Sequence, residues 1–151
     1  MRRIIVALSL AVLIAPIATG QDKTAVMATV RQFVDAFNKG DTKAAVATCA
    51  EQTSIIDEFP PHEWHGAGAC QKWMDDYDAD ARKNGITDGF VTLGSPRHVD
   101  VSADHAYVVV PATYTYKQKG KPANETGSLL TVALQKGGTA WRITAWAWSK
   151  N

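Results

Sequence analysis

The chain has 151 residues, of which 46% are hydrophobic and 21% are charged, and its formal net charge at pH 7 is +1. This composition is typical of a globular domain and excludes a disordered or collagen-like chain. A near-neutral charge balance without an arginine-rich segment gives no reason to expect nucleic acid as a partner.

The N-terminus has the pattern of a secretory signal peptide. Two arginines precede an apolar run over residues 4–15, and small residues follow up to Gly20. A membrane anchor needs about 18 apolar residues, so this run is too short for one and fits a signal peptide over residues 1–20. We therefore expect a periplasmic or secreted protein with one domain over residues 21–151 and no membrane contact after cleavage.

Three helices are expected in the first half of the exported chain. Apolar residues at helical spacing predict a first helix over residues 26–37, which Gly40 ends. Asp41 is placed to cap a short second helix that reaches Cys49. The third helix is predicted over residues 66–84, where the acidic residues are expected to form a solvated face without a function.

Strands follow the helices. A short β-branched strand is predicted over residues 53–59, and an extended piece follows Pro60-Pro61. Apolar and polar residues then alternate with a period of two, which predicts four long antiparallel strands over residues 90–101, 106–117, 125–135 and 141–149. Helices first and strands afterwards indicate an α+β fold with the helices packed on one face of a curved sheet.

The two cysteines, Cys49 and Cys70, both lie in the exported part. An even number of cysteines in an oxidising compartment favours a disulfide between them. The alternative is two buried free thiols, because a free cysteine packs well as a small hydrophobic residue.

The segment from Ser54 to Gly66 carries two acids and two histidines. Alternation places Asp57 on one face with Ile55 and Phe59, and this predicts an inward carboxylate. Asp57 is either a base for proton transfer or a carboxylate held by backbone donors below the Pro-Pro turn. Glu58 is expected on the opposite face, in solvent.

Neither a metal site nor a cofactor is expected. His62 and His65 are three residues apart in an extended segment, so their imidazoles face opposite sides. A zinc site needs at least three converging ligands, which this spacing does not provide.

The order of these elements resembles a known superfamily. The stretches FVDAFNKGDTKAAVATCAEQTSIID, EWHGAGACQKWM and WRITAWAWS, together with the strand meander, are similar to SnoaL-like and ketosteroid-isomerase-like proteins of the nuclear transport factor 2 superfamily. The resemblance spans residues 21–151. It implies a cone-shaped α+β barrel of three N-terminal helices on a mainly antiparallel sheet, with a pocket at the open end.

The resemblance places Asp57 where ketosteroid isomerases keep their general base. Those enzymes also use a tyrosine on the first helix and a protonated acid on a later strand. The matching positions here are Phe33 and residues 128–130, which contain neither group. Since the loss of one such donor costs about 10²–10³ in rate, ketosteroid isomerisation is not expected.

Large apolar side chains are numerous for a small domain, and two interpretations of them stay open. They either fill the cone as an ordinary core or line a pocket for a small, largely apolar ligand. The residues predicted to form such a pocket are Phe33, Phe37, Ile55, Trp64, Trp73, Tyr77, Tyr114, Leu130, Trp146 and Trp148.

The outward positions of the predicted strands are apolar or weakly polar, as at Val109, Thr113, Thr131 and Ala133. Such a face, like the resemblance, favours a homodimer formed through the sheet. Three functions therefore remain open: an exported protein that binds a small apolar ligand, an isomerase, lyase or hydrolase with Asp57 as general base, and a non-catalytic dimeric interaction module.

Overall fold

The computed structural model describes residues 20–151. The predicted signal peptide lies outside the described residues except for Gly20, which is the first residue of α1. Among residues 20–151, no helix combines the length and the apolarity that crossing a bilayer requires.

Three helices form where the sequence predicts them, although the second is shorter. They are α1 (Gly20–Asn38), α2 (Thr42–Val46) and α3 (Ala69–Asn84). The carboxylate of Asp41 accepts a hydrogen bond from the backbone N–H of Ala44 and so caps α2. Cys49 was predicted at the end of this helix but begins the first strand instead.

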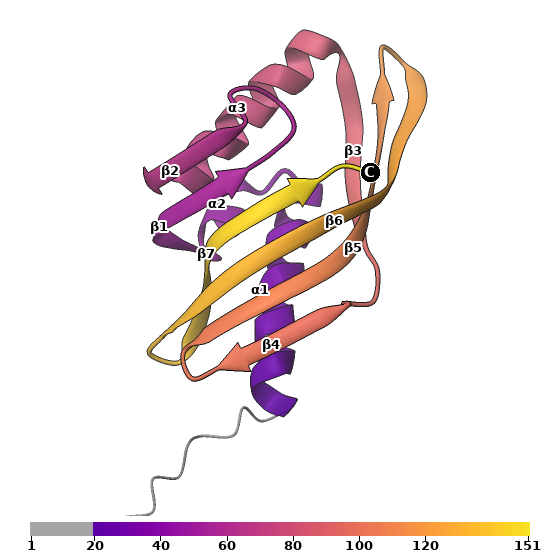
Figure 1. Ribbon diagram of the computed structural model, residues 1–151. Coiled ribbons are helices and arrows are strands. Elements are labelled where there is room, and N and C mark those ends of the chain that lie inside the picture. Colours follow the sequence, from indigo (N-terminus) through magenta and orange to yellow (C-terminus); the bar gives the residue numbers. More distant parts are fainter. Residues whose placement is uncertain (1–19) are drawn as a thin grey trace, which may run out of the picture.

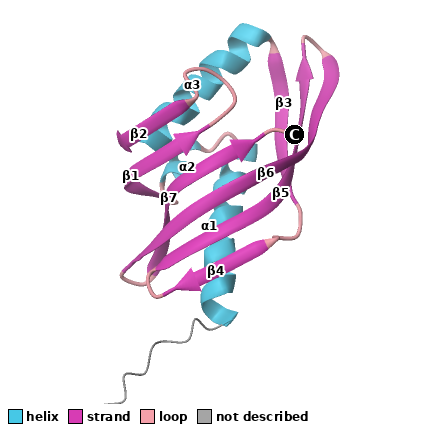
Figure 2. Cartoon of the chain, in the orientation of Figure 1, coloured by secondary structure: helices cyan, strands magenta, loops and turns pink. Residues whose placement is uncertain are grey.

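Seven strands build one sheet (Figures 1 and 2). Their bounds are β1 (Cys49–Ile56), β2 (Glu63–Ala67), β3 (Ile86–Leu93), β4 (His98–Ser102), β5 (His105–Gln118), β6 (Lys121–Gly137) and β7 (Ala140–Ser149). The order is β2-β1-β7-β6-β5-β3, and β4 pairs with β5 beside β3. Only β1 and β7 run parallel, and the other pairs are antiparallel. The predicted α+β class and the mainly antiparallel sheet are thus confirmed.

The strand predicted over residues 90–101 is wrong, because it is two strands. β3 ends at Leu93 and β4 begins at His98, with Gly94 and Pro96 between them. Proline cannot donate to a strand ladder, and glycine weakens strand continuity, so the pairing stops there. Both strands then pair with different parts of the long β5.

The helices lie on the concave face of the curved sheet, as Figure 1 shows for α1 and α3. The buried residues of α1 include Val26, Val30 and Phe33, which belong to one apolar core with the inner face of β5, β6 and β7. The side chain of Asn38 joins the end of α1 to β3, since its amide donates to the carbonyl of Val91 and its oxygen accepts from the Val91 N–H. These bonds fix one wall of the space between α1 and the sheet.

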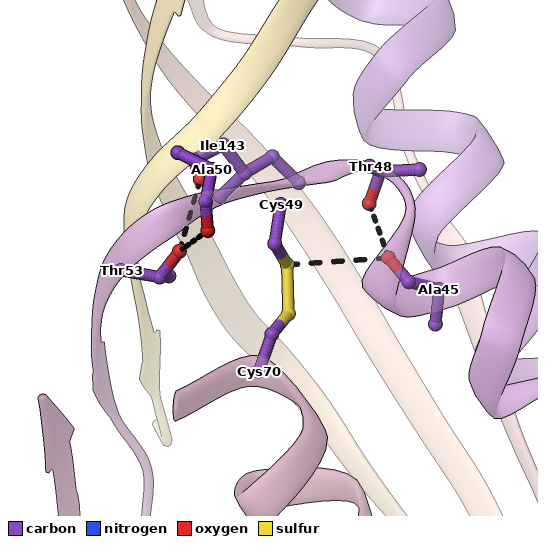
Figure 3. The surroundings of a disulfide bond; sticks show 7 residues. All are labelled: Ala45, Thr48, Cys49, Ala50, Thr53, Cys70 and Ile143. Carbon is purple, nitrogen blue, oxygen red and sulfur yellow. Dashed lines mark hydrogen bonds between the residues drawn. A yellow bond between two sulfur atoms is a disulfide. The ribbon is translucent and has the colours of Figure 1, made fainter. Parts of the chain in front are cut away.

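Cys49 and Cys70 form a disulfide, as predicted (Figure 3). The bond joins the start of β1 to the first turn of α3, and both cysteines are buried. Closing a loop between residues 21 apart contributes about 3 kcal/mol in the chain-entropy model. The disulfide therefore holds the start of β1 against the start of α3, and the loop that carries Asp57 follows the other end of β1.

Candidate functional site

A cavity of about 270 Å³ opens between α1, α3 and the concave face of the sheet. Side chains from both helices, from the loop after β1 and from four strands line it. Aromatic rings provide much of the wall: Phe33, Phe37, Phe59, Trp73, Tyr77, Tyr114, Tyr116, Trp146 and Trp148. The ring centroids of Trp73 and Trp146 are 4.8 Å apart with their planes perpendicular. These rings pack on one another and still leave room for a small molecule.

Eight of the ten residues predicted for the pocket line this cavity, namely Phe33, Phe37, Trp73, Tyr77, Tyr114, Leu130, Trp146 and Trp148. Ile55 and Trp64 do not line it, and their assignment to the pocket is corrected. Ile55 is fully buried in β1. The indole N–H of Trp64 donates to Asp76 at 2.8 Å, and its ring packs on Phe59. Both therefore belong to the packing of β1 and β2 against α3.

Asp57 lies in the wall of the cavity, just after the end of β1. One carboxylate oxygen accepts from the indole N–H of Trp73 at 2.9 Å, and the other accepts from the backbone N–H of Glu58 at 2.7 Å. Burial raises the pKa of Asp57 from 3.8 to about 6, against these two hydrogen bonds, which lower it. The site therefore combines both alternatives left open for Asp57: a local backbone contact and a perturbed carboxyl group inside a cavity.

Glu58 is exposed, as predicted, but it does not face away from Asp57. Its side chain lines the cavity and forms an ion pair with Lys150 at 2.9 Å. Strand alternation ends at Ile56, because the chain turns there and the N–H of Asp57 donates to the carbonyl of His62. Adjacent residues in such a turn can face the same side. Burial raises the pKa of Glu58.

Glu125 on β6 is a site residue that alternation did not find. Its side chain lines the cavity, is only 7% exposed and accepts from Lys150 at 3.0 Å. The pairs Ala112–Ser128 and Tyr114–Glu125 show one extra residue on β6, a β-bulge next to Gly127, whose φ is +78°. The bulge shifts the phase of β6 and turns Glu125 inward. The glycine before Ser128 is the sequence signal that could have indicated it.

The phenols of Tyr77 and Tyr114 meet in the wall of the cavity. The hydroxyl groups of Tyr77 and Tyr114 are hydrogen-bonded at 2.5 Å. Burial raises the pKa of both tyrosines, so both are neutral at ordinary pH, and one of the two hydroxyls donates to the other. Gly89 of β3 lies against the pair, since a Cβ at this position would be 2.7 Å from each phenol oxygen. Polar donors are thus present in the cavity, although Phe33 provides none.

The two histidines do not join this site. The ring Nδ1 of His62 is 3.2 Å from the carbonyl oxygen of Asp57, and His65 lies between Ser54 and Glu63 on the exposed side of β2. Among the described residues, no three side chains of the histidine, cysteine or acidic type are grouped to hold a metal ion.

Acidic residues of α3 are not all part of a solvated face. Asp80 lines the cavity, and Asp76 accepts the indole N–H of Trp64 and pairs with Lys72. The predicted solvated face is therefore interrupted at these two residues, which are half-buried. Asp75 and Asp78 are exposed, as predicted.

Residues 26–150 match the family model of the SnoaL-like domain. No curated protein matches the sequence. The match covers all strands, α2, α3 and most of α1, so it includes every side chain that lines the cavity.

Solved structures share the fold at low sequence identity. A ketosteroid isomerase-like protein from Erwinia carotovora atroseptica is 19% identical, with a TM-score of 0.69 over 87% of this chain and 98% of that chain. A nuclear transport factor 2-like superfamily protein from Salmonella enterica serovar Typhimurium is 16% identical, with a TM-score of 0.71 over 85% and 89%. A protein of unknown function from Mycobacterium tuberculosis is 16% identical, with a TM-score of 0.72 over 88% and 78%. At these identities the likeness shows the fold alone.

The raised pKa of Asp57 predicts a pH-dependent effect of Asp57→Asn on stability. In the unfolded chain the carboxyl loses its proton near pH 3.8, but in the folded chain it does so near pH 6. Between these values the folded state holds the extra proton, so the wild-type protein loses stability as the pH rises, and the asparagine variant does not. The free energy of unfolding is measured with urea at pH 4 and pH 8. The value for the variant minus the value for the wild type should be larger at pH 8 than at pH 4, by up to ~3 kcal/mol.

The matched control is Asp100→Asn, which changes an exposed carboxylate on β4. Its difference from the wild type should be the same at both pH values. A difference between Asp57→Asn and the wild type that does not change with pH would show that Asp57 has an ordinary pKa.

Proposed function

The chain belongs to the SnoaL-like family, and from this premise we propose that it is an exported protein that binds a small, largely apolar molecule in the cavity. The observation that carries the proposal is the cavity itself: about 270 Å³, walled mainly by aromatic rings and ended by a few polar groups. Ligand sites in proteins commonly have this combination of apolar wall and few polar contacts. Trp146 and Trp148 form part of the wall and leave the space open.

Two buried polar atoms near the cavity support a ligand role. Within residues 20–151, the indole N–H of Trp146 and the Oε2 of Glu125 have no hydrogen-bond partner. Both residues line the cavity. Buried polar groups are nearly always paired in folded proteins, so two unpaired groups beside one cavity favour a functional site there over an ordinary core.

Filling the cavity from α3 tests this function. Ala81 lines the cavity, whereas Ala79 on the same helix is exposed. Native mass spectrometry of protein from its own host should show a retained small molecule for the wild type and for Ala79→Phe. For Ala81→Phe the retained fraction should fall about tenfold or more, because the phenyl group occupies the space of the ligand.

Equal retention by Ala81→Phe and the wild type would refute binding in this cavity. If no molecule survives purification, a fragment screen by ligand-observed NMR replaces it. If no apolar fragment then binds Ala79→Phe more tightly than Ala81→Phe, the result counts against the proposal.

One observation favours a second function, an isomerase, lyase or hydrolase in which Asp57 is the general base. Asp57 lies in the cavity wall, and its pKa of about 6 is close to the range in which a carboxylate accepts and returns a proton efficiently. The phenols of Tyr77 and Tyr114 could stabilise negative charge on the reacting molecule.

A ligand with acidic C–H groups makes the second function measurable. Hydrogen–deuterium exchange at its carbon atoms should be catalysed by the wild type, with a rate that rises through pH 6 as the Asp57 carboxylate forms. Asp57→Asn should lower the rate by about 10²-fold or more, while Asp100→Asn should leave it unchanged. An unchanged rate in Asp57→Asn would remove Asp57 from the mechanism.

Export and dimerisation are proposed on separate grounds. The pattern of residues 1–20 and the Cys49–Cys70 disulfide support an oxidising, extracytoplasmic location, periplasmic or secreted. The half-buried, weakly polar positions Val109, Thr131 and Ala133 support a homodimer through the outer face of the sheet.

One preparation tests both. The intact mass of protein from the extracytoplasmic fraction should correspond to a chain that begins at Gln21, and light scattering should give twice the mass of one chain. A full-length mass would contradict export with cleavage, and a single-chain mass would contradict the dimer.

A further inference from the structure

Negative charge is in excess around the cavity. Four carboxylates line it, from Asp57, Glu58, Asp80 and Glu125, and Lys150 is the only basic side chain of the described residues that does so. If all are ionised, the lining carries a formal excess of three negative charges. Such an excess lowers the free energy of unfolding unless a positive charge balances it, because burying unpaired charge is costly.

Asp57 has no positive partner. Its two hydrogen bonds come from neutral donors, the indole of Trp73 and the backbone N–H of Glu58. The salt bridges within residues 20–151 do not include Asp57. The neighbouring charges that act on it are Glu58 and Glu125, which are both negative. A carboxylate in these surroundings lacks a counterion that the ligand can provide.

Glu125 points to the same conclusion independently. It is more than nine-tenths buried, lines the cavity and has one oxygen, Oε2, without a partner in the described part of the chain. Its other oxygen shares Lys150 with Glu58, at 3.0 Å and 2.9 Å. One ammonium group therefore serves two carboxylates, and the neighbouring Glu125 contributes to the raised pKa of Glu58, which shows that negative charge is crowded here.

Aromatic walls suit the same kind of ligand. The face of an aromatic ring attracts an organic cation, and aromatic rings provide much of the cavity wall in which Asp57 lies. We propose that the ligand of this cavity is an organic cation, an apolar molecule whose protonated or quaternary amine lies beside Asp57. This inference rests on the proposed binding function and names the chemical class of its ligand.

The same charges exclude other classes. A ligand carboxylate or phosphate would add negative charge to a site that already has an excess, at short range and partly shielded from water. A neutral ligand would leave Asp57 without a counterion. Among residues 20–151, Lys150 is the only basic side chain lining the cavity that would oppose a cation, and it is more than half exposed.

Three probes of one shape test the inference: phenylpropylamine, phenylpropanol and phenylpropionate. They share a phenyl ring and chain and differ in charge at the end. Their dissociation constants are measured by isothermal titration calorimetry at pH 8, where the Asp57 carboxyl is ionised. The amine should bind about tenfold or more tightly than the alcohol, and the carboxylate should bind most weakly.

Variants assign the effect to residues. Asp57→Asn keeps the shape of the side chain and should abolish the preference for the amine, with alcohol binding unchanged. Glu125→Gln should reduce the preference and provides a second reading if Asp57→Asn does not fold. Lys150→Met should shift the preference in the opposite direction, toward tighter amine binding, because it removes a competing cation. The exposed control Asp100→Asn should bind all three probes as the wild type does.

The outcomes separate the two proposals. Alcohol binding as tight as amine binding overturns the organic cation and leaves an apolar binding cavity in place. Binding of none of the three probes overturns the cation and counts against the binding function as well. A preference for the amine that survives in both Asp57→Asn and Glu125→Gln overturns the assignment of the cation to this site.

Discussion

The indole of Trp73 is the contact on which the arrangement of the cavity depends. It projects from α3 and packs on Phe37 of α1 and Trp146 of β7, with ring centroids 5.6 Å and 4.8 Å away. Its N–H donates to Asp57 in the loop after β1. A single rigid side chain thus fixes the distances among two helices, the sheet and the acid. Movement of any one of these walls would disturb the others, because aromatic packing and the hydrogen bond must be satisfied together.

The site concentrates polar groups that a stability-optimised core would not contain. Asp57, Glu58 and Glu125 are carboxylates in or near an apolar cavity, and two of them depend on one exposed lysine. Burial of such groups lowers the free energy of unfolding unless they are paired. Proteins retain such local conflicts mainly at functional sites, where the unpaired group acts on a ligand. The likeness to solved structures shows the fold alone, so this local chemistry carries the functional argument.

Alternation of side chains explains both the successes and the errors of prediction. Trp146, Leu130 and Tyr114 were predicted for the pocket, and they line the cavity. Glu58 and Glu125 were missed as cavity residues because the period is interrupted beside each of them, by the turn after β1 and by the bulge that follows Glu125 in β6. A one-residue change of phase exchanges the two faces of a strand.

The sequence by itself determined the α+β class, the three helices and the periodic apolar positions of the helices and strands. These features follow from local spacing and from residue type, which are visible along the chain. Only the tertiary structure decided that the aromatic rings leave a cavity, and that Glu58, Glu125 and Lys150 meet at its mouth. Those residues are 25 to 92 positions apart in sequence. Their meeting depends on turn geometry, on the register of β6 and on the return of the C-terminus beside β1, and no local pattern encodes these.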